Sequence, residues 1–192
     1  GMAGAVEAAG EFLDGPLMVV SSNDVLEEGA YRKMMETAEV GACDAALLAC
    51  RVGSYFPGGY LVTEPDLRVT HIVEKPEPGT EPSDLVNVVV HFHREPLKLL
   101  EALSRVETEK DDRYEVALDT MMREGRRVVA VPYVGFWSPL KYPWDVFPVM
   151  EHFVWGVRRR VALSASVHPS AVVEGTVVLA DGVRVLENAV IR

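Results

Sequence analysis

The sequence is poor in cysteine, in long apolar runs and in basic residues, and each shortage excludes a class of protein. Its two cysteines, Cys43 and Cys50, lack the number for a disulfide framework and the spacing for a metal site, so we interpret them as buried thiols in a reducing compartment and expect a cytoplasmic protein. No apolar run approaches the roughly 20 residues of a membrane helix, and the start has no basic segment typical of a signal peptide. A net charge of −10 disfavours nucleic acid and anionic membranes as partners.

The remaining composition is that of a folded globular protein, and its pattern predicts an α/β domain. Helical segments alternate with short apolar segments over residues 1–157, which favours a Rossmann-like layered domain with a mainly parallel sheet. The near-continuous apolar run 17–20 predicts a central strand covered on both faces. The predicted helices are 3–12, 30–39, one opening at Glu95-Pro96, 114–124 and 143–157, and the predicted strands are 17–20, 45–52, 68–73, 86–92 and 127–134.

Residues 158–192 have a different residue pattern, in which an aliphatic side chain recurs at every sixth position. A period of six matches neither a helix nor a plain strand, and it is typical of the hexapeptide repeats of a β-helix. Such repeats bury their core only against neighbouring repeats, so we expect this segment to stack on further coils, another domain or another subunit, and we expect a homo-oligomer. The aliphatic series is Val167, Val173, Leu179, Val185 and Ile191.

Asp24 follows the apolar run 17–20, where ligands bind in open α/β sheets. An aspartate at such a strand end is able to hold Mg²⁺ against a phosphate. The alternative is a helix N-cap or Asx turn, because a predicted helix follows.

The tripeptide Glu74-Lys75-Pro76 closes the predicted strand 68–73. Pro76 biases Lys75 toward an extended backbone, which would aim the ammonium and the Glu74 carboxylate in opposite directions. That pair suits a substrate with a phosphate and hydroxyl groups. The alternative is an exposed strand end with charged residues.

His91 and His93 lie two residues apart on a predicted strand and therefore on one face. With no third ligand nearby in the sequence, packing or surface roles are favoured over a metal site. The chain has no Gly-x-Ser-x-Gly motif, no Cys/His nucleophile pair and no Walker loop.

Taken in order along the chain, these motifs resemble the sugar-1-phosphate nucleotidyltransferases with a left-handed β-helix tail, such as glucose-1-phosphate thymidylyltransferases and N-acetylglucosamine-1-phosphate uridyltransferases. The resemblance covers essentially the whole chain. The motifs are Gly1-Met2-Ala3-Gly4-Ala5-Val6, Phe12-Leu13, Asn23-Asp24, Pro57-Gly58-Gly59, Val73-Glu74-Lys75-Pro76, Asn87, Phe136-Trp137 and the hexapeptide series.

The resemblance implies transfer of a nucleotidyl group from a nucleoside triphosphate to a sugar 1-phosphate, with Mg²⁺ as cofactor and release of pyrophosphate. It implies that Gly1, Met2 and Ala3 contact the nucleotide base and that Asp24 binds the metal. The implied sugar-phosphate residues are Gly59, Glu74, Lys75 and Asn87. The family's glycine-rich loop, whose Arg and Lys grip the triphosphate, is expected ahead of Gly1, so catalytic residues are not assigned within this sequence.

Two residues depart from the family pattern and keep other functions open. Pro139 occupies the position of a second metal-binding Asp, and Val89 replaces a Gly expected two residues after Asn87. A catalytically degraded relative that binds a sugar nucleotide and regulates or scaffolds is therefore the alternative. An acyltransferase is a third hypothesis, because hexapeptide helices often host acyl transfer, with His168 as the only candidate base in the repeats.

Overall fold

The computed structural model describes residues 1–40, 43–155 and 157–192, which form two compact units, Gly1–Pro139 and Leu140–Arg192. The sequence pattern predicts a boundary at residue 157 instead. The two divisions differ in the assignment of the segment around helix α5.

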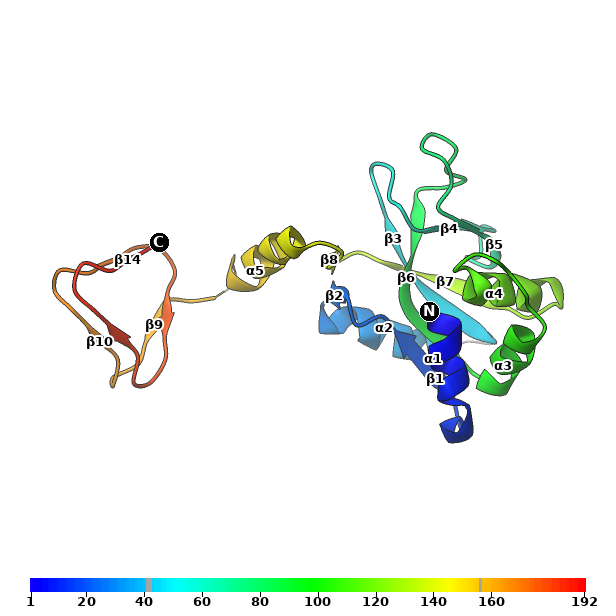
Figure 1. The fold of residues 1–192 in the computed structure, drawn as a ribbon, viewed down its shortest axis with the longest axis horizontal. Coiled ribbons are helices and arrows are strands. Elements are labelled where there is room, and N and C mark those ends of the chain that lie inside the picture. Colours follow the sequence, from blue (N-terminus) through cyan, green and yellow to red (C-terminus); the bar gives the residue numbers. More distant parts are fainter. Residues whose placement is uncertain (41–42, 156) are drawn as a thin grey trace. The chain divides into compact units, whose positions relative to one another are not determined.

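The first unit is a layered α/β structure in which helices cover both faces of a central sheet (Figure 1). Helices α1, α3 and α4 pack on one face, and α2 packs on the other. A short 3-10 turn follows α1 at Gly10–Phe12. The helices are α1 (Met2–Ala8), α2 (Glu28–Val40), α3 (Pro96–Ser104) and α4 (Arg113–Arg123), close to the predicted ranges.

The sheet has mixed strand directions, so the mainly parallel sheet predicted from the sequence is wrong for the described residues. The strand order is β5-β4-β6-β3-β7, with β1 also paired to β6. Only the pairing of β3 with β7 is parallel within this sheet, and the others are antiparallel. The physical reason is that no helix connects β3, β4, β5 and β6, whereas parallel neighbours need a crossover connection; β4 and β5 are joined directly by a short loop. The strands are β1 (Leu17–Val20), β3 (Ala45–Arg51), β4 (Gly59–Thr63), β5 (Val69–Glu74), β6 (Leu85–His93) and β7 (Val128–Tyr133).

Strand β1 is not the doubly covered central strand that its apolar sequence predicts. It pairs with β6 alone, lies off the main strand order and is only partly buried. Strand β3 takes the central position instead, with Ala45 to Cys50 buried in succession. Alternate residues of β3 enter the two cores, Leu47 toward α3 and α4 and Leu48 toward α2.

A second, two-stranded antiparallel sheet joins β2 (Asp24–Leu26) to β8 (Trp137–Pro139). It brings together segments more than 100 residues apart in the sequence.

The second unit begins with the turn η2 (Pro143–Asp145) and α5 (Val146–Trp155), and the predicted end of this helix near residue 157 adjoins residue 156, which lies outside the described residues. Six two-residue strands follow, each paired in parallel with the strand 18 residues away. The five aliphatic residues of the six-residue series occupy the second position of β10 to β14, and Leu179 and Val185 are buried. The strands are β9 (Arg160–Val161), β10 (Ser166–Val167), β11 (Val172–Val173), β12 (Val178–Leu179), β13 (Arg184–Val185) and β14 (Val190–Ile191).

None of the helices in the described residues has the length and hydropathy that a membrane crossing requires.

Candidate active site

Three of the predicted sugar-binding residues lie close together on the neighbouring strands β5, β4 and β6 of the first unit's sheet. Gly59 begins β4 and pairs with Glu74, the last residue of β5. A Cβ atom at Gly59 would lie 3.0 Å from Glu74 Oε2 and 3.6 Å from Asn87 Cβ. Asn87 comes from the neighbouring strand β6. The missing side chain of the buried Gly59 therefore lets the Glu74 carboxylate and the Asn87 side chain lie close to the β4 backbone.

Lys75 joins this cluster, although not in the predicted geometry. The sequence predicts an extended backbone with the Lys75 ammonium directed away from Glu74. Lys75 has a φ of +45° instead, its N–H donates to Gly58 O at 3.1 Å, and its Nζ lies 3.1 Å from Glu74 Oε1. The hairpin hydrogen bond and the ion pair together outweigh the preference for an extended residue before proline. The Lys75 side chain is 61% exposed, so its ammonium is accessible to a ligand.

Two acidic residues of the α4 region add to the electrostatics of the cluster, and sequence reasoning missed both. The pKa of Lys75 is raised mainly by its hydrogen bond to Glu74 and also by Glu115 and Asp111. Burial raises the pKa of Glu115 to about 7, with further contributions from Glu74, Asp112 and Asp111. No sequence motif marks these residues, since only the packing of α4 brings them near β5.

The predicted nucleotide-binding residues Gly1, Met2 and Ala3 form the start of α1, with Gly1 as its N-cap. A Cβ at Gly1 would lie 2.4 Å from Asp111 Oδ1, so a larger residue would displace this carboxylate. Ala3 is buried in the core beneath α1, which leaves Gly1 and the partly buried Met2 nearer the surface. Asp111 thus links this end of α1 with the electrostatic surroundings of Lys75.

Asp24, the predicted metal ligand, lies in β2 and not at a helix N-cap. Its Oδ1 accepts a hydrogen bond of 2.9 Å from Trp137 Nε1. Its partner across the strands is Pro139, which has no carboxylate. Cys50 is near enough that the Asp24 charge raises the thiol's pKa, although burial is the larger cause of the rise to about 11. Asp24 is held in a defined orientation, but the facing position supplies no second carboxylate.

His91 and His93 share one face of β6, as predicted, and both contact Tyr114. Across the described ranges, no group of three or more histidine, cysteine or acidic side chains is arranged to hold a metal ion. Within those ranges, the two histidines are therefore packed, hydrogen-bonded residues of the core.

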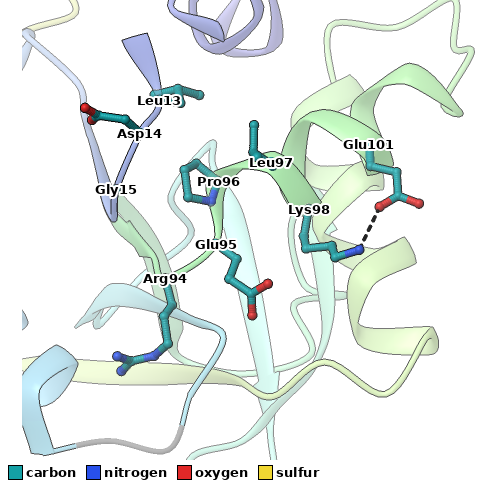
Figure 2. A pocket seen from close by; sticks show the side chains of 9 residues that line it. All are labelled: Leu13, Asp14, Gly15, Arg94, Glu95, Pro96, Leu97, Lys98 and Glu101. Atoms are coloured by element: carbon teal, nitrogen blue, oxygen red, sulfur yellow. Dashed lines mark hydrogen bonds and ion pairs between the residues drawn. The ribbon is translucent and has the colours of Figure 1, made fainter. Parts of the chain in front are cut away.

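The cavity in Figure 2, about 370 Å³ in volume, contains none of the predicted site residues. It lies beside the end of β6 opposite to Asn87, where Arg94 follows the strand. Arg94 donates to the carbonyl oxygens of Cys43 and Ala38, and Lys98 pairs with Glu101 at 3.1 Å. Arg94 and Lys98 of the cavity lining therefore make structural contacts within the protein.

Comparisons with known proteins agree with the fold and identify the family. The family model described as nucleotidyl transferase matches residues 1–140. The chain is similar to the UTP-bound UGPase from Acinetobacter baumannii, with 17% identity, a TM-score of 0.66, and coverage of 80% of this chain and 56% of that one. It is also similar to a putative glucose-1-phosphate thymidylyltransferase from Bacillus anthracis in complex with a sucrose, with 13% identity, a TM-score of 0.64, and coverage of 83% and 63%.

A UDP-glucose pyrophosphorylase complexed with UDP-glucose is similar at 17% identity and a TM-score of 0.68, with coverage of 80% of this chain and 61% of that one. The chain thus matches less than two thirds of the length of these solved structures. No curated protein matches it.

Proposed function

Because this chain belongs to the nucleotidyl transferase family, we propose that it transfers a nucleotidyl group from a nucleoside triphosphate to a sugar 1-phosphate. In this reaction an oxygen of the sugar phosphate attacks the α-phosphorus of the triphosphate, and pyrophosphate leaves with the electrons of the broken bond. The observation that carries the proposal is the convergence of Gly59, Glu74 and Asn87 beside the accessible ammonium of Lys75.

The chemistry of this cluster suits a phosphorylated sugar. A sugar hydroxyl both donates and accepts hydrogen bonds, and Glu74 Oε2, which lies 3.0 Å from the Cβ position of Gly59, is an acceptor. The Asn87 amide, whose Cβ lies 3.6 Å from the same position, offers a donor. The Lys75 ammonium is the charge we assign to the phosphate, as a point-charge binder.

We assign the nucleotide base to the start of α1, at Gly1, Met2 and Ala3. The assignment rests on the resemblance of this segment to the family's base-binding turn. In the structure, Gly1 lets the Asp111 carboxylate lie close to the backbone. Residues that grip the triphosphate are not assigned within this chain.

We assign Mg²⁺ to Asp24. Mg²⁺ uses one or two carboxylates together with phosphate and water oxygens, so a single carboxylate fits when the substrates supply the rest. The hydrogen bond from Trp137 fixes the Asp24 carboxylate, as outer partners do for metal ligands. The bound ion would neutralise charge on the transferring phosphoryl group.

Pro139 favours a second candidate function, a sugar-nucleotide-binding subunit without catalysis. It faces Asp24 in the register of β2 and β8, where it contributes no metal ligand. Such a subunit would keep the affinity of the Gly59 cluster for a nucleotide sugar and lack turnover.

For residues 158–192 we propose a left-handed β-helix of hexapeptide repeats, preceded by an α/β domain over residues 1–157. The 18-residue offset of the paired strands equals three hexads, as expected for a coil with three sides. We further propose that this segment supports a homo-oligomer and that the protein is cytoplasmic, since Cys43 and Cys50 are both free thiols.

The test is release of pyrophosphate by the full chain with Mg²⁺, using a panel of nucleoside triphosphates and sugar 1-phosphates. Activity that falls at least tenfold in Asp24→Ala and in Lys75→Met supports the transferase. Lys98→Met is the matched control, because Lys98 forms an equivalent 3.1 Å pair with Glu101 outside the cluster. Wild-type silence on every pair, together with binding of UDP-glucose, would favour the non-catalytic subunit. Silence with no binding would refute both functions.

A further inference from the structure

A bulge interrupts strand β6 beside the proposed sugar site. Leu48 of β3 pairs with Val88 of β6, but the neighbouring Leu47 pairs with His91, so β6 carries two extra residues over this step. In a regular strand four residues span ~13 Å, which would separate Asn87 from His91. The bulge shortens this separation, and His91 Nε2 lies 2.8 Å from Asn87 Oδ1.

A chain of buried hydrogen bonds continues from His91 into α4. The Tyr114 hydroxyl lies 3.0 Å from His91 Nδ1 and 2.8 Å from His93 Nε2. All three side chains are almost fully buried. Burial lowers the pKa of His91 to about 3 and that of His93 to about 4, so each ring is neutral and carries one proton at neutral pH.

The acceptor oxygen of Asn87 determines the direction of each hydrogen bond in the series Asn87–His91–Tyr114–His93. Asn87 Oδ1 only accepts, so His91 donates through Nε2–H and its Nδ1 accepts from the Tyr114 hydroxyl. The Tyr114 oxygen then accepts from His93 Nε2–H. This order leaves a lone pair on His93 Nδ1, which is the buried side-chain atom found without a partner in the described part of the chain.

The same order leaves the Asn87 NH₂ group available as a donor. Within the ranges that the structure describes, no hydrogen bond from this group to the protein is found. Asn87 is partly exposed, and its Cβ lies 3.6 Å from the position that a Cβ at Gly59 would take. We propose that His91, Tyr114 and His93 are positioning residues that hold the Asn87 amide with its NH₂ group toward a ligand oxygen. The identity of this ligand, a sugar hydroxyl of a nucleotide sugar, rests on the proposed function. The orientation of the Asn87 amide does not depend on it.

The orientation is tested without any ligand by ¹⁵N NMR of the imidazoles in the full chain. The expected spectrum has His91 protonated on Nε2 and not on Nδ1 between pH 6 and 8. In the Tyr114→Phe variant, we expect the tautomer populations of the two histidines to shift. Protonation of His91 on Nδ1 in the wild type would overturn the proposal.

The effect on binding is tested with two matched variants and UDP-glucose as the calorimetric probe. His91→Gln keeps an N–H near the position of Nε2, whereas His91→Asn keeps an acceptor for Tyr114 but loses the donor to Asn87. We expect the Kd to rise about tenfold in His91→Asn, as for one lost hydrogen bond, and to stay within about twofold in His91→Gln.

Equal Kd values in the two variants would mean that the His91–Tyr114–His93 hydrogen bonds have only a structural role, and would overturn the proposal. If the wild type binds neither UDP-glucose nor glucose 1-phosphate, the proposed function fails, while the NMR result still decides whether the amide is held as inferred.

Discussion

Gly59 is the residue whose missing side chain lets Glu74 and Asn87 lie close together in the proposed sugar site. A Cβ there would lie 3.0 Å from Glu74 Oε2 and 3.3 Å from Ile72 Cγ2, closer than ordinary contacts. Gly59→Ala is therefore expected to displace the Glu74 carboxylate and weaken UDP-glucose binding about tenfold, which calorimetry measures. Gly53→Ala is the control, because no atom lies within 4 Å of its added methyl. Equal affinities in both variants would contradict a ligand site over Gly59.

Glu115 is a half-buried carboxyl whose folded-state pKa, about 7, exceeds its ordinary value of 4.5. A raised carboxyl pKa means that the protonated form is favoured by folding, so the stability it contributes is full below pH 4.5 and is lost as the pH rises through 7. Glu115→Gln removes this titration. We expect equal stability near pH 4.5 and a variant more stable by about 1–2 kcal/mol at pH 8, after discounting for partial exposure.

Urea unfolding at several pH values measures this difference. Glu109→Gln is a comparison at an exposed glutamate of the loop before α4, and its pH profile is expected to follow the wild type. A Glu115→Gln profile parallel to that of the wild type would show that Glu115 ionises normally.

Among the elements, the six-residue repeat makes the second unit the easiest to test. Leu179 of β12 is 6% exposed within a small aliphatic core, whereas Leu163 has its side chain fully in solvent. Leu179→Ala is expected to destabilise this unit by about 2 kcal/mol, near the lower end of buried leucine truncations because the core is small. Leu163→Ala is expected to change it by less than 0.5 kcal/mol, roughly the limit for surface substitutions.

Limited proteolysis of residues 160–192 during urea titration reports the stability of this unit apart from the first. Equal proteolysis of the two leucine variants would show that Leu179 is not in a packed core.

The sequence was sufficient to predict the helices and five strands of the main sheet, but it missed β2, β4 and β8 and did not indicate how the strands pair. The strand predicted at 45–52 is found at Ala45–Arg51, because local apolar pattern and flanking loops set its limits. The pairing of β1 with β6, by contrast, depends on contacts across about 70 residues, which leave no local pattern. The apolar run in β1 therefore predicted a strand correctly, but the prediction that this strand is central was wrong.

The candidate site divides in the same way. Glu74 and Lys75 belong to one motif and were predicted together, while the approach of Asn87 and Gly59 follows from strand register. Asp111 and Glu115 entered the site through the packing of α4, and the bonding of His91 to Asn87 required a bulge that no residue pattern announced. Which of these residues lie together depends on strand register and tertiary packing, and residue type alone does not reveal it.

At the scale of the whole molecule, the net charge of −10 opposes any anionic ligand. In the proposed site, Lys75 is surrounded by Glu74, Glu115 and Asp111, so the local field does not reverse this repulsion. Salt shortens the range of the repulsion, from about 30 Å at 0.01 M to about 10 Å at 0.1 M. We predict that the affinity for glucose 1-phosphate stays constant or rises by up to about threefold over this change in NaCl.

Calorimetric titrations at constant pH measure this dependence, with KCl in place of NaCl as the control for a specific ion effect. A basic phosphate site would respond in the opposite direction, since salt weakens attraction between opposite charges. Adding Mg²⁺ at matched ionic strength is expected to strengthen nucleoside triphosphate binding in the wild type but not in Asp24→Ala, because the carboxylate is then missing from the metal's ligands. A tenfold loss of glucose 1-phosphate affinity between 0.01 and 0.1 M NaCl would instead place the ligand on a cationic surface away from Glu74 and Glu115.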